Sequence, residues 1–77
     1  MTTFKFTLVI SKPEMDDVKA ADYLYANGCD DALFGMTNGE YTLDFARKAL
    51  TRIDAVFTAI RDVNTSHAGV RVLGVCF

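Results

Sequence analysis

The sequence has no tryptophan, one proline, one histidine and two cysteines among its 77 residues. So few cysteines argue against a disulfide-stapled scaffold, and we expect both thiols to be reduced. With His67 as the single histidine, no Cys/His cluster has zinc spacing, and we expect neither a metal nor a cofactor. The apolar runs are shorter than the roughly 20 residues that span a bilayer. The first residues lack the charged and apolar regions of a signal peptide, so we expect none. We therefore expect a cytoplasmic protein without membrane contact.

The chain is short but rich in apolar residues. Its 77 residues indicate one domain, residues 1–77, and half of them (51%) are hydrophobic, with six phenylalanines. A chain of this length buries only about 60–65% of its unfolded surface, so an isolated monomer would be marginally stable. This composition predicts that some apolar surface is buried against a partner.

Charge is unevenly distributed along the chain, although the net charge is only −2. Residues 1–44 carry three lysines and eight acidic residues, whereas residues 45–77 carry five basic residues and two aspartates. Such asymmetry is typical of solvated faces on neighbouring helices. The later basic residues are Arg47, Lys48, Arg52, Arg61 and Arg71. They are spread out rather than gathered in a stripe, so we expect no direct nucleic-acid binding by this segment.

The clearest local signal is Asn38-Gly39, a pair that favours a two-residue type I′ hairpin turn. Pairing outward from this turn predicts Thr37 opposite Glu40, Met36 opposite Tyr41, Phe34 opposite Leu43 and Ala32 opposite Phe45. Three apolar pairs then share one side, and a slip of one residue would destroy the match.

The rest of the chain predicts two strands and two helices. Alternation predicts a strand over Phe4–Ile10 with Phe6 and Leu8 facing inward. A capping box over residues 11–14 predicts that a helix begins near Ser11, and Asn27-Gly28 predicts its end. Thr51 is the expected N-cap of the second helix. The expected apolar stripes are Met15, Val18, Ala21, Leu24 and Tyr25, then Ile53, Val56, Phe57, Ile60 and Val63. Residues 70–77 predict a last strand.

The order strand, helix, strand, strand, helix, strand predicts a ferredoxin-like α+β sandwich, with both helices on one face of a four-stranded antiparallel sheet. The opposite face would then carry polar and apolar side chains together, whereas an exposed antiparallel face is usually polar. We expect this open face to pack against a second copy or an adjacent domain. The expected interface residues are Val9, Leu33, Leu73, Val75 and Phe77.

Two places carry side chains that could do chemistry. Gly28-Cys29-Asp30-Asp31 lies between the first helix and the second strand, and Asp44 lies in the middle of a central strand. A reactive cysteine needs a cationic neighbour or a helix N-terminus, but Cys29 follows a helix and precedes two carboxylates, so a structural role is favoured. Asp44 is expected to pair with Lys5 or Arg71, with ligand binding as the alternative.

Several segments together resemble a family of small uncharacterised bacterial proteins. They are Phe6-Thr7-Leu8-Val9, Asp22-x-Leu24-Tyr25, Gly28-Cys29-Asp30-Asp31-Ala32, Leu43-Asp44-Phe45-x-Arg47-x-Ala49 and Ala59-Ile60-x-Asp62-Val63. Longer members of that family continue into a helix-turn-helix segment of DNA-binding type, whereas this sequence stops at Phe77. The resemblance implies an accessory module that dimerises a regulator or receives a signal.

These observations favour a non-enzymatic interaction and dimerisation module, accessory to a transcriptional regulator. The alternative is a regulatory domain that senses a small molecule at a dimer interface near Gly28–Asp31, with Gly28, Cys29, Asp30, Asp31 and Asp44 as its binding residues. That alternative rests on fold analogy. An enzyme with Asp44 or Cys29 as its working group is the least favoured hypothesis.

Overall fold

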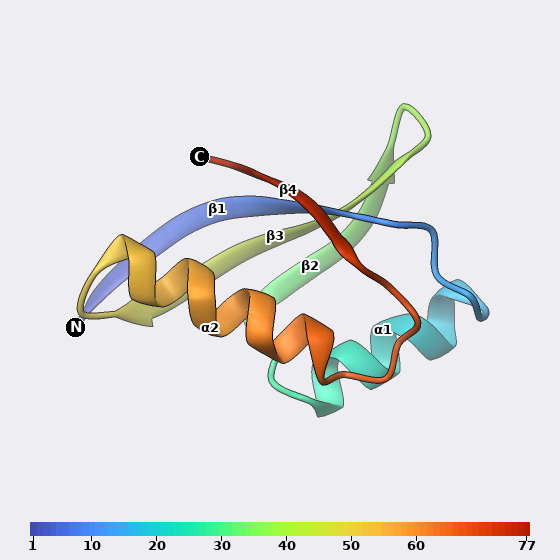
Figure 1. The fold of residues 1–77 in the computed structure, drawn as a ribbon, viewed down its shortest axis with the longest axis horizontal. Coiled ribbons are helices and arrows are strands. Elements are labelled where there is room, and N and C mark those ends of the chain that lie inside the picture. Colours follow the sequence, from blue (N-terminus) through green and yellow to red (C-terminus); the bar gives the residue numbers. More distant parts are fainter.

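The computed structural model describes residues 1–77 and has an α+β fold (Figure 1). In chain order the elements are β1 (Thr2–Ile10), α1 (Asp17–Ala26), β2 (Ala32–Thr37), β3 (Glu40–Ala49), α2 (Arg52–Asn64) and β4 (Val72–Cys76). The four strands form one antiparallel sheet in the order β2-β3-β1-β4. Figure 1 shows both helices on the same side of this sheet, which leaves the other face open. None of the helices has the length and hydrophobicity required to cross a membrane.

The expected hairpin is confirmed, including its register. Thr37 pairs with Glu40, Met36 with Tyr41, Phe34 with Leu43 and Ala32 with Phe45. Asn38 and Gly39 both adopt positive φ, 52° and 81°, as a type I′ turn requires. Turn chemistry and hydrophobic alternation therefore select the same pairing.

The helix ends agree with the sequence in two places and differ in one. Thr51 caps α2 by accepting the Asp54 N–H at 3.2 Å, and α1 ends at Asn27-Gly28 as expected. The expected start of α1 near Ser11 is wrong, because Asp16 is its N-cap and accepts the Val18 N–H. The Ser11 hydroxyl instead accepts the Arg71 N–H at 2.8 Å. A contact 60 residues away along the chain replaces the local capping box.

The core lies between the helices and the inner face of the sheet. The rings of Phe6 and Phe45 stack at its centre, with centroids 5.3 Å apart. The helices contribute mostly small residues to this core, namely Ala20 and Leu24 from α1 and Ala55, Ala59 and Val63 from α2. The expected stripes were therefore wrong in part, since Val18, Ile53 and Phe57 are about 70% exposed. The small alanine side chains therefore face the sheet, and these larger side chains face outward.

The last strand, β4, is shorter than expected and irregular. Leu8 pairs with Val75 and Val9 with Gly74, but the register shifts before Ile10 pairs with Val72. Paired residues share a face of the sheet, so Val75 points to the same side as buried Leu8. The expected place of Val75 on the open face is therefore corrected.

Candidate functional site

Arg47 is the most unusual side chain in the molecule, because it is a charged residue in an inward row of β3. Alternation along β3 turns Phe45, Arg47 and Ala49 toward the helices, and Arg47 is only 7% exposed. Its guanidinium also lies 5.0 Å from the centroid of the Phe45 ring. A buried arginine is expected to have its charge and its donors satisfied.

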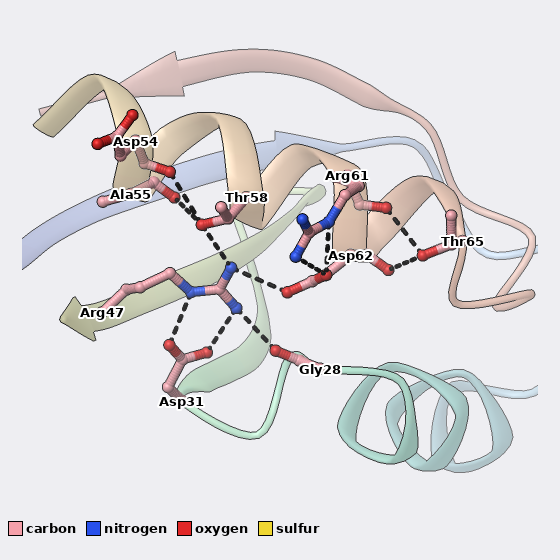
Figure 2. A network of polar contacts seen from close by, with 9 residues as sticks. All are labelled: Gly28, Asp31, Arg47, Asp54, Ala55, Thr58, Arg61, Asp62 and Thr65. Atoms are coloured by element: carbon pink, nitrogen blue, oxygen red, sulfur yellow. Dashed lines mark hydrogen bonds and ion pairs between the residues drawn. The ribbon is translucent and has the colours of Figure 1, made fainter. Parts of the chain in front are cut away.

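All five N–H donors of the Arg47 guanidinium make hydrogen bonds, as Figure 2 shows. Nε and one Nη make a bidentate contact with Asp31, at 2.8 and 3.0 Å. The other Nη donates to Asp62 at 2.9 Å and to the Thr58 hydroxyl at 3.1 Å. The Gly28 carbonyl accepts the fifth bond at 2.7 Å. The site thus joins β3 to α2 and to the loop between α1 and β2, and its guanidinium has no donor left for a ligand.

The loop that carries Gly28 and Asp31 is shaped to reach this arginine. Gly28 has φ of +107°, and a Cβ at this position would lie 2.9 Å from the carboxylate of Asp62. Only glycine combines that φ with such a close approach. The Asp31 carbonyl accepts the Ala46 N–H at 3.0 Å, so Asp31 is held to β3 by its backbone as well as by its side chain.

Charge in this site is balanced, because Arg61 donates to the second oxygen of Asp62 at 3.2 Å. Burial lowers the pKa of Arg47, but the hydrogen bonds and negative charges of Asp31 and Asp62 outweigh it and raise that pKa above its usual range. Cys29 lies beside the cluster and is fully buried. Burial, aided by Asp62, raises the pKa of its thiol to about 11. At neutral pH Cys29 is therefore a protonated thiol and a poor nucleophile.

The structure separates the five candidate binding residues. Gly28 and Asp31 bind Arg47, Cys29 is in the core and Asp30 is exposed. Asp44 lies on the open face of the sheet, where the Thr7 hydroxyl donates to it at 2.6 Å. The expected partners Lys5 and Arg71 are therefore wrong. Thr7 lies directly opposite Asp44 in the β1–β3 register, whereas Lys5 lies opposite Ala46.

The expected interface residues are also divided between the two faces. Val9 and Leu33 lie on the open face, and Leu33 is 72% exposed. Leu73 is exposed at the irregular part of β4. Phe77 lies beside α2, with its ring centroid 5.4 Å from the Arg52 guanidinium, so its expected place on the open face is corrected. The open face is consequently less apolar than the sequence suggested.

A second surface was not anticipated. Residues of α2 and Phe77 line an apolar groove of about 240 Å³, which we call the α2 groove. It is lined by Arg52, Ile53, Val56, Phe57 and Phe77. Ile53 and Phe57 were expected in the core and instead form the wall of an exposed groove.

Sequence reasoning missed Arg47 as well, although a usable signal was present. The alternation that faces Phe45 inward also faces Arg47 inward, and an inward arginine requires carboxylate partners. Comparisons with family models, with curated proteins and with solved structures find no match to this chain.

Proposed function

We propose that this chain is a non-enzymatic protein-interaction module with a ferredoxin-like arrangement of two interleaved β-α-β units. The strand order β2-β3-β1-β4 with antiparallel neighbours supports that arrangement. The resemblance noted in the sequence suggests that the module is accessory to a transcriptional regulator, and this role is part of the proposal.

The α2 groove is the observation that carries the proposal. Ile53 and Phe57 are each 67% exposed, and Phe77 is 76% exposed. Taking about 200 Å² for a whole aromatic side chain, the two rings alone expose about 300 Å². Burying that area would contribute about 7 kcal/mol before the costs of association. An apolar patch of about this area is the largest on many monomeric proteins, and such a patch is often functional.

The side chains that could have taken part in catalysis or ligand binding are engaged in structural contacts, and this supports a non-enzymatic role. The donors of Arg47 are all occupied, and the Asp44 carboxylate accepts from Thr7. The Cys29 thiol is buried beside carboxylates that help to keep it protonated. A small molecule at Gly28–Asp31 would have to displace bonds that Arg47 already makes.

A photoreactive benzophenone amino acid at position 57, in the cells that express the protein, tests the proposal. The new side chain is aromatic, like Phe57, and projects from the exposed wall of the α2 groove. We expect ultraviolet light to attach a polypeptide at position 57, and not when the same group replaces Lys19 on α1. No adduct at position 57, or a metabolite that raises the melting temperature of the purified chain by several degrees, would overturn the proposal.

A further inference from the structure

The outward side of α2 carries a row of residues with the spacing of a helix-pairing seam. Ile53, Phe57, Ile60 and Asn64 follow one another at steps of four, three and four residues. At 3.6 residues per turn this row stays on one side of the helix. Ile53, Phe57 and Asn64 are exposed and Ile60 is half-buried. The seam therefore offers apolar side chains along most of the 13 residues of α2.

We infer that the occupant of the α2 groove is a second copy of this chain, whose α2 packs antiparallel on the first around a two-fold axis. The inference rests on the proposed function and names the partner of the same surface. Antiparallel pairing places Phe57 of one copy opposite Ile60 of the other, and Ile53 opposite Asn64. The Ile60 side chain then enters the groove between Phe57 and Phe77.

Charge along one flank of the seam selects the antiparallel direction. Asp54 and Arg61 are seven residues apart, so they lie on the same flank of α2, about 10 Å apart along its axis. Asp54 forms no ion pair, and its carboxylate points away from the Arg47 site (Figure 2). The Arg61 side chain donates to Asp62 at 3.2 Å but is still 68% exposed, so its guanidinium can also contact a second carboxylate. A two-fold axis brings this flank of one helix against the same flank of the other, so Asp54 of each copy meets Arg61 of the other.

The most exposed apolar residue of α1 lacks this self-complementarity. On α1, Val18 is 70% exposed and lies between Asp17 and Asp22 in a groove of about 380 Å³. Two copies joined through that groove would place acidic side chains against acidic side chains. The same groove could accept a basic-flanked α2 from another copy in a head-to-tail contact, which is the main competing arrangement.

The exposed area sets the strength to expect. A standard interface buries about 800 Å² on each partner, and the rings of Phe57 and Phe77 supply less than half of that. We therefore expect a dimer in the micromolar range, measured by light scattering of the purified chain from about 5 to about 500 µM. The mass should rise from 8.5 kDa toward twice that value as concentration increases.

Two matched substitutions locate the contact. Phe57→Lys should leave a monomer at every concentration, while its melting temperature stays within a few degrees because the side chain is already exposed. Val18→Lys introduces the same change on α1 and should leave the dimer intact. Dissociation by Val18→Lys would show a head-to-tail contact, and dissociation by Leu33→Glu would show a contact through the open sheet face. Either result overturns the inference.

Charge reversal tests the two-fold geometry directly. Asp54→Arg and Arg61→Asp should each weaken the dimer about tenfold or more, because each places like charges opposite each other twice. A mixture of the two variants should restore a dimer at wild-type concentrations, since both contacts are then between opposite charges. Far-UV circular dichroism checks that each variant is folded. If the mixture does not form a dimer at these concentrations, the inference is overturned.

A chain that stays monomeric up to the highest concentration also overturns the inference, but it does not decide the proposed function. In that case an adduct at position 57 in cells would contain a different polypeptide, and the α2 groove would serve another partner. If no adduct forms either, both statements fail.

Discussion

Replacing Arg47 with alanine would remove the one cation that Asp31, Asp62, Thr58 and the Gly28 carbonyl share. Two carboxylates would then face each other across a small cavity, with only Arg61 left near one of them. Removing one member of a buried ion pair costs about 3–5 kcal/mol, because the remaining charge stays buried and unpaired.

Partial exposure reduces this cost. The Asp31 side chain is 30% exposed and that of Asp62 is 16% exposed, so water solvates part of the charge that Arg47 leaves behind. We therefore expect Arg47→Ala to lower the free energy of unfolding by about 3 kcal/mol. A chain of this length has a total stability of about 4–12 kcal/mol, so the variant would be folded but marginal.

Urea unfolding followed by far-UV circular dichroism measures the effect. With a slope of about 1 kcal/mol per molar, the midpoint should fall by about 3 M. Arg52→Ala is the matched control, because Arg52 is exposed and only stacks on Phe4 and Phe77, at 5.8 and 5.4 Å. Its loss should cost less than about 1 kcal/mol. Equal losses for Arg47→Ala and Arg52→Ala would refute the reasoning.

A companion variant separates buried charge from lost packing. Arg47→Met keeps most of the side-chain volume but still leaves Asp31 and Asp62 unpaired. Adding Asp31→Asn and Asp62→Asn removes the two orphaned charges, so the triple variant should be more stable than Arg47→Met alone. If the triple variant is less stable, packing by the arginine stem, and not its charge, holds the site together.

Three further predictions concern Gly28 and the two cysteines. Gly28→Ala should cost about 1–3 kcal/mol in urea unfolding, because of its φ of +107° and the 2.9 Å approach to Asp62. Gly35→Ala, which has open space around it, should cost less than Gly28→Ala, and equal effects would contradict the explanation. A thiol reagent at pH 8 should modify exposed Cys76 and spare buried Cys29 until the protein unfolds. Because folding raises the pKa of Cys29 from 9.0 to about 11, its contribution to stability is complete below pH 9 and is lost toward pH 11. Between pH 9 and pH 11, the free energy of unfolding should therefore fall more steeply for the wild type than for Cys29→Ala. Parallel curves of this free energy against pH would exclude the raised pKa of Cys29.

Local sequence was sufficient for the features that neighbouring residues decide. The Asn38-Gly39 turn and its register follow from the positive φ of two residues and from the alternation around them. The Thr51 cap likewise needs only a hydroxyl and the Asp54 N–H three residues later. By contrast, the capping box at Ser11 failed because a distant backbone group, the Arg71 N–H, occupies the hydroxyl.

Helix faces could be predicted only in part, because hydrophobicity does not say how closely a helix approaches the sheet. Both Ala55 and Phe57 are hydrophobic, so their residue types alone would allow either one to be buried. The close approach of α2 buries Ala55 and Ala59 and leaves Phe57 exposed. The α2 groove exists because Phe57 faces outward and Ala55 faces the sheet, so periodicity alone could not predict it.

The element order and the hairpin register could be predicted from the sequence, since they depend on turn chemistry and on hydrophobic periodicity. The same period of two residues also turns Arg47 inward, but that residue was recognised only in the folded chain. The partners of Arg47, by contrast, depend on long-range packing. Asp31 and Asp62 lie 16 and 15 residues from it along the chain, on opposite sides in sequence. Packing of the loop and α2 against β3 brings them to one guanidinium, and no local pattern encodes a contact of that length.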